Sequence, residues 1–154
     1  MEMQTFWTQV KEKLEIVMER TEEMFPYTTQ NGRFVPKDKR REFVTWWTNS
    51  FWTGMLWLMY RETGEGSYQK KAQRNEEALD ECFTRYFQRL HHDVGFLWLL
   101  SAVANYRITG NEQSKMRGMR AASTLASRYQ IHGHFIRAWN GEEPGVSIID
   151  TMMN

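Results

Sequence analysis

Residues 54–64 read Gly-Met-Leu-Trp-Leu-Met-Tyr-Arg-Glu-Thr-Gly, and this stretch decides the fold because most of it occurs twice. Gly54-Met-Leu-Trp-Leu returns as Gly95-Phe-Leu-Trp-Leu, and Tyr60-Arg-Glu-Thr-Gly returns as Tyr106-Arg-Ile-Thr-Gly. Each copy reads as an apolar helix that ends at a glycine, where a left-handed cap needs no Cβ. The repeat therefore indicates one helical hairpin used twice.

Two kinds of helix alternate along the chain. Residues 51–60 and 94–104 are apolar nearly all round, which is typical of helices covered on every side. Three other segments carry apolar residues on one face and charge on the other. Their apolar positions are Phe6, Val10, Leu14, Val17 and Met18, then Leu79, Cys82, Phe83 and Tyr86, then Met116, Met119, Leu125 and Tyr129. We predict an all-α fold of inner and outer helices, in an open solenoid or a closed toroid, with strand signals nearly absent.

Composition sets the class of protein. The length of 154 residues predicts a single domain, residues 1–154. Lys and Arg total 20 against 19 Asp and Glu, so the net charge of +1 gives no electrostatic reason to expect nucleic acid or an anionic membrane as partner. The start of the chain lacks the apolar core of a secretory signal, and no apolar run is long enough to span a membrane.

The single cysteine, Cys82, lies at helical spacing among apolar residues and is expected to be a buried thiol. With the missing secretory signal, this predicts a cytoplasmic protein. The methionines Met55, Met116 and Met119 are expected to fill the core.

Polar residues stand at the starts of the inner helices. If the hairpins repeat, the inner helices are parallel, and their N-termini gather at the end that also carries the long connections, residues 26–45 and 130–147. Those starts hold Asn49, Asp93 and Asp150. One interpretation is that all three are N-caps that accept backbone N–H groups. The other is that one carboxylate is a general acid whose pKa is raised by burial and by its like-charged partner.

A metal cluster was the third possibility for this end of the molecule. His91, His92 and Asp93, with His132 and His134, offer imidazole and carboxylate groups that suit zinc or iron. Adjacent histidines at a helix start usually point in different directions, and no second motif of known ligand spacing is present. We therefore predict no metal and no cofactor.

Four strings, in order, resemble glycoside hydrolase family 88, the unsaturated glucuronyl hydrolases. They are Trp47-Thr-Asn-Ser-Phe-Trp52 with the Gly54 motif, Leu90-His-His-Asp-Val-Gly-Phe96, Phe135-Ile-Arg-Ala-Trp139, and Ile148-Ile-Asp-Thr-Met-Met-Asn154. The unsaturated rhamnogalacturonyl hydrolases share the fold, but the His-His-Asp string is closer to the glucuronyl enzymes. The resemblance implies a toroid of six helix hairpins, (α/α)6, of which this chain holds the amino-terminal half.

The resemblance also implies roles for individual residues. Asp150 matches the catalytic acid and base, and Asp93 its partner carboxylate. Trp47 and Trp139 match residues that line the sugar site, and His92 is expected beside them as a substrate-binding residue. The implied reaction is hydration of the C4=C5 double bond of unsaturated glucuronyl oligosaccharides, without a cofactor. Ser50, where the family typically has glycine, departs from the pattern.

The expected end of the chain, early in the sixth helix, leaves other readings open. An unfinished toroid would expose apolar flanks of its inner helices, through which copies could self-associate. A non-catalytic helical-repeat module that binds sugar or protein is one alternative. An inactive truncated remnant is the other.

Overall fold

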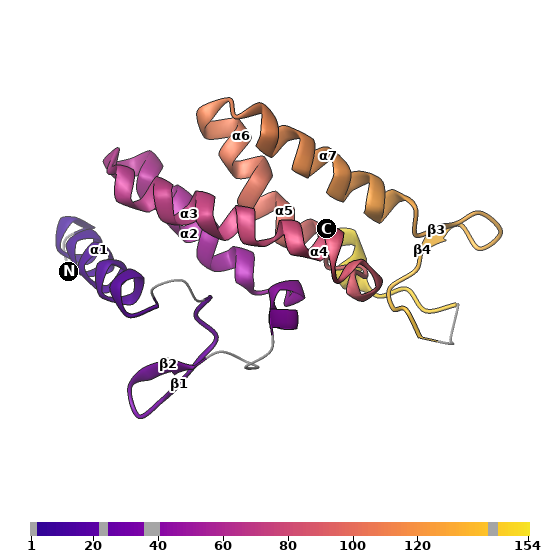
Figure 1. Ribbon diagram of the computed structural model, residues 1–154, viewed down its shortest axis with the longest axis horizontal. Coiled ribbons are helices and arrows are strands. Elements are labelled where there is room, and N and C mark those ends of the chain that lie inside the picture. The colour runs from indigo at the N-terminus through magenta and orange to yellow at the C-terminus, as the bar shows by residue number, and fades with distance from the viewer. Residues whose placement is uncertain (1–2, 22–24, 36–40, 142–144) are drawn as a thin grey trace.

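The computed structural model describes residues 3–21, 25–35, 41–141 and 145–154. Its centre is the predicted pair of helical hairpins (Figure 1). The first hairpin consists of α2 (Asn49–Thr63) and α3 (Gly66–Ala78). In the second, the inner arm runs through α5 (Val94–Trp98), the π-helical stretch η3 (Leu99–Val103) and α6 (Ala104–Thr109), and the outer arm is α7 (Glu112–Ala126).

Both hairpins turn at the predicted glycines. Gly64 and Gly110 adopt left-handed conformations, with φ of 73° and 75°. The N–H of each donates to a tyrosine carbonyl four residues earlier, Tyr60 and Tyr106, at 2.8 Å in both cases. A side chain would be strained at this φ, so the repeated glycine marks the turn. The predicted positions of the two inner helices and of their glycine turns are confirmed.

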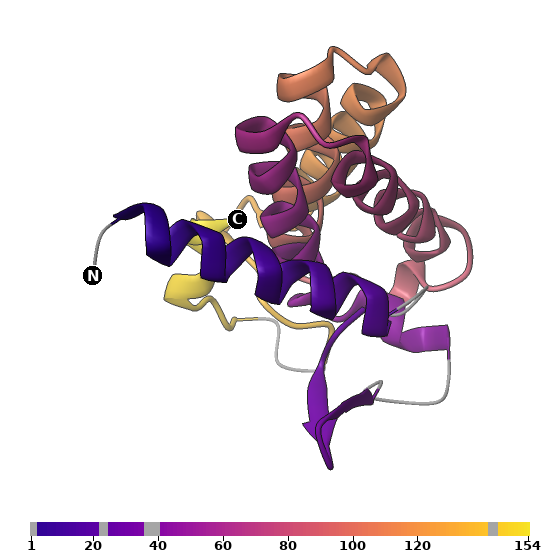
Figure 2. The same ribbon diagram turned by 90° about the vertical axis from the view of Figure 1, so that its left-hand side faces the viewer.

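Short helices and one long helix complete the chain. They are α1 (Met3–Thr21), η1 (Arg41–Thr45), α4 (Asp80–Thr84), η2 (Phe87–Arg89) and η4 (Ile149–Met153). Helix α1, in indigo, lies beside the α2–α3 hairpin (Figure 2), where Leu14, Val17 and Met18 pack against its core. Part of the predicted apolar face of this helix therefore contacts the rest of the fold, whereas Phe6, also predicted on that face, is 54% exposed.

The core has two parts, one for each hairpin. Trp57, only 1% exposed, is central to the first, and Trp98, also 1% exposed, is central to the second. Trp98 stacks on Phe83 with ring centroids 4.3 Å apart. Cys82 is a fully buried free thiol, as predicted, and burial raises its pKa to about 12.

Two short hairpins of strands were not predicted. β1 (Thr28–Gln30) pairs antiparallel with β2 (Arg33–Val35), and β3 (Tyr129–Gln130) with β4 (Phe135–Ile136). The turn between β1 and β2 is Asn31-Gly32, both at positive φ, which is the strongest short signal for a two-residue hairpin. The expectation that strands are nearly absent is therefore corrected at these two hairpins, while the all-α class stands.

Glycines allow the π-helical stretch to fit between its neighbours. A Cβ on Gly54 of α2 would lie 3.3 Å from the Cβ of Leu100, and one on Gly118 of α7 would lie 2.8 Å from a methyl group of Val103. Helices on both sides of η3 thus approach it at a residue without a side chain. The Gly54 contact thus brings the two inner arms close together, and the Gly118 contact brings the outer helix α7 close to the inner arm.

A buried carboxylate joins the two hairpins. Glu76 of α3 is fully buried, and it accepts hydrogen bonds from Asn105 at 2.7 Å, from Ser114 at 2.6 Å and from Arg117 at 2.9 Å. Arg117 also donates to both carboxylate oxygens of Asp80, at 2.8 and 2.6 Å. These contacts connect α3, α6 and α7. A charge in such a position is tolerated only because it is fully hydrogen-bonded.

Several apolar side chains are exposed, and this corrects two expectations. Helix α2 exposes Phe51, Met55 and Leu58, which lie on one face, so the inner helices are not covered on every side in this chain. Met55, Met116 and Met119, expected in the core, are 43%, 67% and 60% exposed. Among the described residues, no helix is both long and apolar enough to cross a membrane.

We expect Glu76→Ala to lower the free energy of unfolding by about 3 kcal/mol, because it strands three buried or half-buried donors at the junction of the hairpins. Urea denaturation at pH 7 measures this loss. Glu77→Ala, on the exposed side of the same helix, is the matched control and should cost less than about 0.5 kcal/mol. Equal losses in the two variants would contradict a structural role for the buried network.

Candidate active site

The starts of the inner helices meet at one end of the molecule, as predicted. Asp93 directly precedes α5, and Asp150 lies in η4. His92 contacts both carboxylates, so residues far apart in the sequence share one site. Helix α2 begins beside them, since Trp47 packs on Phe96 of α5 with ring centroids 5.8 Å apart.

The N-cap interpretation of the polar residues is wrong. Asn49 is the first residue of α2 rather than its cap, and its side-chain amide donates to the carbonyls of Phe43 and Val44 at 2.9 and 3.2 Å. Asp93 occupies the N-cap position of α5, but its side chain makes no capping hydrogen bond. Asp150 lies inside η4, whose N-cap is Ile148. Both carboxylates are therefore available for other contacts.

His92 is held by the backbone of a distant loop. It is 1% exposed, and its Nδ1 lies 2.9 Å from the carbonyl oxygen of Ala138. Since a carbonyl only accepts, Nδ1 carries a proton. The other ring nitrogen, Nε2, lies 3.1 Å from Oδ1 of Asp93 and 3.7 Å from Oδ2 of Asp150. The ring is thus fixed with Nε2 toward both carboxyl groups.

This geometry requires a proton at the site. A neutral His92 ring would present an Nε2 lone pair to two ionised carboxylates, which would bring only acceptors together. The contact is favourable when the imidazole is doubly protonated or when one carboxyl group keeps its proton. His92, Asp93 and Asp150 therefore form one cluster, in which Nε2 of His92 faces an oxygen of each carboxyl group.

The two aspartates differ in exposure. The Asp93 side chain is 10% exposed and that of Asp150 is 52% exposed. Burial raises the pKa of the Asp93 carboxyl, His92 lowers it, and the charge of Asp150 raises it again. The buried carboxyl with the raised pKa is therefore Asp93, and Asp150 is the one open to a ligand.

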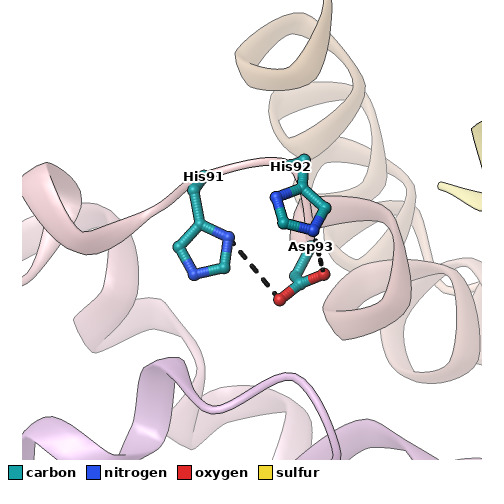
Figure 3. A group of neighbouring side chains, drawn as sticks. All are labelled: His91, His92 and Asp93. Atoms are coloured by element: carbon teal, nitrogen blue, oxygen red, sulfur yellow. Dashed lines mark ion pairs between the residues drawn. The ribbon is translucent and has the colours of Figure 1, made fainter. Parts of the chain in front are cut away.

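His91 approaches the same carboxylate from another side (Figure 3). Its Nδ1 lies 3.5 Å from Oδ2 of Asp93. The two adjacent histidines thus point toward one group, contrary to the expectation that they would diverge. Burial, together with the charges of His92 and Arg128, lowers the pKa of His91 to about 4.

Aromatic rings line the site. The Trp139 ring meets the His92 ring edge to face at 4.4 Å and the His91 ring at 5.1 Å, and it is 45% exposed. Trp47 packs on Phe51 and on Phe96, with centroids 5.6 and 5.8 Å apart. Trp139 therefore lies directly against the His92 ring, whereas Trp47 packs on Phe96 of α5, the helix that Asp93 directly precedes.

Two residues that connect the parts of the site were not predicted. Arg128 and Asn140 hydrogen-bond the loop that carries Trp139 to the backbone before His91. Their partners are mostly backbone carbonyls of residues distant in the sequence, and because every residue has a backbone carbonyl, no local motif predicts such contacts.

One group of described residues could hold a metal ion. His91, His92 and Asp93 each offer a ligand atom, and these atoms lie within 4.8 Å of one another. The Nδ1 of His134 instead contacts the Tyr129 hydroxyl, at 3.2 Å. Because Ala138 already engages Nδ1 of His92, a metal would have to bind through Nε2 and displace the contact with Asp93. The absence of a metal stays a prediction.

The comparisons with known proteins point to one group of enzymes. No family model matches the chain. An unsaturated chondroitin disaccharide hydrolase of Streptococcus pneumoniae is 32% identical over 145 residues, which are 92% of this chain and 36% of the relative. The crystal structure of the unsaturated glucuronyl hydrolase of Bacillus sp. GL1, described as responsible for the degradation of glycosaminoglycan, superposes with a TM-score of 0.73 at 30% identity. It covers 86% of this chain and 35% of that one.

This chain is related to the unsaturated glucuronyl hydrolases. Its all-α fold is accordingly part of an (α/α)6 toroid. A third relative, a mutant of the Streptococcus agalactiae enzyme complexed with dGlcA-GalNAc6S, has a TM-score of 0.65 at 32% identity and covers 76% of this chain and 30% of its own. The chain spans about a third of the length of the relatives that it matches.

We expect the stability of the protein to fall as pH drops below neutrality, through His91. Its pKa is lowered in the folded state, so its contribution is complete above pH 6.5 and is lost as pH falls toward 4. Between pH 7 and pH 4, the wild type should lose about 2 kcal/mol more than His91→Gln, after allowance for partial solvent screening.

Urea denaturation at both pH values tests this expectation. His132→Gln, on the exposed β3–β4 hairpin, is the control and should keep the wild-type pH dependence. If His91→Gln also keeps it, burial of a neutral His91 is not the cause.

Proposed function

We propose that this chain is part of a hydrolase that acts on unsaturated glucuronyl, or related unsaturated uronyl, oligosaccharides by hydration of the C4=C5 double bond. The observation that carries the proposal is the approach of Asp93 and Asp150 to the same nitrogen of His92, at 3.1 and 3.7 Å. The names of the relatives, and the unsaturated disaccharide in one of their complexes, support the substrate class.

The substrate is a vinyl ether, and its hydration needs a general acid and a water molecule. In the proposed scheme the carboxyl group of Asp150 protonates C4, and the resulting carboxylate accepts a proton from the water that attacks C5. The hemiketal that forms then opens and releases the neighbouring sugar. No covalent glycosyl-enzyme forms, so the carboxylate-distance rule for retaining and inverting enzymes does not apply.

The exposure of the two aspartates suits these roles. Asp150 can reach a ligand, and a bound sugar would cover its carboxyl group and favour the neutral, proton-donating form. Asp93, buried behind it, would share a proton with His92 and tune the charge near Asp150. In this scheme Asp93 and Asp150 act as a pair, with His92 between them.

The sugar would bind on aromatic side chains. Trp139 exposes nearly half of its surface beside the His92–Asp93 group, and indole rings offer flat apolar faces to sugars. Trp47, packed on Phe51 and Phe96, would extend this surface. We assign both tryptophans to substrate binding, together with His92.

About two thirds of the length of the relatives has no counterpart in this chain. We expect the groups that hold the substrate carboxylate and the attacking water to lie in that remainder. Self-association is a second way to complete the site, and the exposed row Phe51, Met55 and Leu58 of α2 supplies an apolar surface for it. Sedimentation velocity of the purified chain measures whether copies associate.

We expect Asp150→Asn to abolish turnover while sugar binding is retained. The assay follows the ultraviolet absorbance of the C4=C5 bond of an unsaturated glucuronyl disaccharide mixed with the purified chain. Loss of a general acid should slow the decay of absorbance by about a hundredfold or more. Tryptophan fluorescence titration with the same disaccharide measures binding.

Glu77→Gln, a neutralised carboxylate on the exposed face of α3, is the control and should behave as the wild type. Unchanged behaviour of Asp150→Asn in both assays would favour the alternative, a helical-repeat module that binds sugar without chemistry. A wild-type chain that binds the disaccharide without converting it would mean that turnover needs the groups expected in the unmatched remainder of the relatives. A wild-type chain that does neither would favour an inactive remnant.

A further inference from the structure

The guanidinium of Arg128 binds three successive backbone carbonyls beside the site. Arg128 follows the C-cap of α7 and is half-buried. Its Nε donates to the carbonyl of Arg137 at 2.8 Å, and its Nη2 donates to those of Ala138 and Trp139 at 3.0 and 3.1 Å. Three successive carbonyls of the loop that carries Trp139 thus converge on one side chain.

The remaining nitrogen, Nη1, connects this loop to the segment before α5. It donates to the side-chain carbonyl of Asn140 at 2.8 Å and, at 3.4 Å, to the carbonyl of Leu90. Asn140 in turn donates to the carbonyls of Gln88 and Leu90, each at 3.0 Å. Leu90 directly precedes the His91-His92-Asp93 string. Arg128 and Asn140 therefore fasten two parts of the site to each other.

The set of acceptors is unusual for an arginine. An arginine has five N–H donors, and here they meet five oxygens, all of them neutral carbonyls. Among the described residues, no carboxylate lies within ion-pair distance of Arg128. Burial and the nearby charge of Arg137 lower the pKa of Arg128. The position of the Arg128 side chain is therefore explained by the planar, forked shape of the guanidinium group and not by pairing with an opposite charge.

The loop that Arg128 holds also orients His92. The Ala138 carbonyl, which accepts from Arg128, accepts from the backbone N–H of His92 at 3.2 Å and contacts its Nδ1 at 2.9 Å. The next residue is Trp139, whose ring contacts that of His92. A shift of this carbonyl would therefore move Trp139 and turn Nε2 of His92 away from the two aspartates.

We propose that Arg128 is a positioning residue, which holds Trp139 and His92 in place through the carbonyls of residues 137–139. Its effect on sugar binding rests on the proposed function, but its effect on the place of Trp139 does not. A lysine keeps the charge yet has three donors on a single nitrogen, so it cannot reach five carbonyls spread around a fork.

The experiment compares Arg128→Lys with Arg120→Lys. Arg120 lies on the exposed side of α7 over the Phe83 ring, so its replacement changes the same chemical group without touching the loop. Acrylamide quenching of Trp139 is obtained as the difference between each protein and its Trp139→Phe counterpart, at a temperature where circular dichroism shows full folding. We expect quenching to rise about twofold in Arg128→Lys and to stay unchanged in Arg120→Lys. Affinity for the unsaturated disaccharide should fall about tenfold in Arg128→Lys alone.

The outcomes separate this inference from the proposed function. Unchanged Trp139 quenching in a folded Arg128→Lys overturns the positioning role, even if the wild type hydrolyses the disaccharide. Raised quenching in a chain that does not bind the disaccharide supports the positioning of Trp139 and contradicts the function. If Arg128→Lys does not fold, Asn140→Ala, at an exposed residue, tests the same connection. It should also raise Trp139 quenching, and no rise in it overturns the inference.

Discussion

The architecture depends on the burial of one carboxylate. Glu76 is fully buried, and its oxygens accept hydrogen bonds from Asn105 of α6 and from Ser114 and Arg117 of α7. An ionised group in such surroundings is stable only when each helix keeps its position, because any separation leaves it without compensation. The outer layer of the first hairpin is thereby fixed to the second hairpin. Because the two hairpins are held side by side, the starts of their inner helices lie at the same end of the molecule, where Asp93 and Asp150 come together.

Local sequence predicted what local rules control. The glycine turns at Gly64 and Gly110, the buried thiol and the gathering of the inner-helix starts all follow from periodicity and backbone preference. The Asn31-Gly32 turn follows an equally local rule, since both residues adopt the positive φ that a two-residue hairpin requires. The other features that were predicted wrongly, or not at all, depend on contacts with residues distant in the sequence. Asp93 occupies the N-cap position of α5, but its side chain contacts His92 and makes no capping hydrogen bond.

The same distinction applies to the candidate site. The residue types at Asp93, Asp150 and Trp139 could be picked out because they stand in strings that resemble a known family. Arg128 and Asn140 could not, because they bind carbonyl groups that every residue has, and only the fold brings those carbonyls together. The direction of the His92 ring likewise follows from a backbone oxygen 46 residues away. Side-chain chemistry at this site is thus set by main-chain atoms that no motif records.

The π-helical stretch η3 compensates for a difference in length between the two inner helices. Gly54 and Tyr60 are six residues apart, whereas their counterparts Gly95 and Tyr106 are eleven apart. Five further residues of ordinary α-helix would rotate the second motif by about 140° relative to the first, at about 100° per residue. The extra length equals that of η3, whose wider turn advances less per residue and so takes up part of the rotation. The longer inner arm can therefore present its tryptophan and its turn to the same neighbours as the shorter one, and a change of length is absorbed without repacking either end.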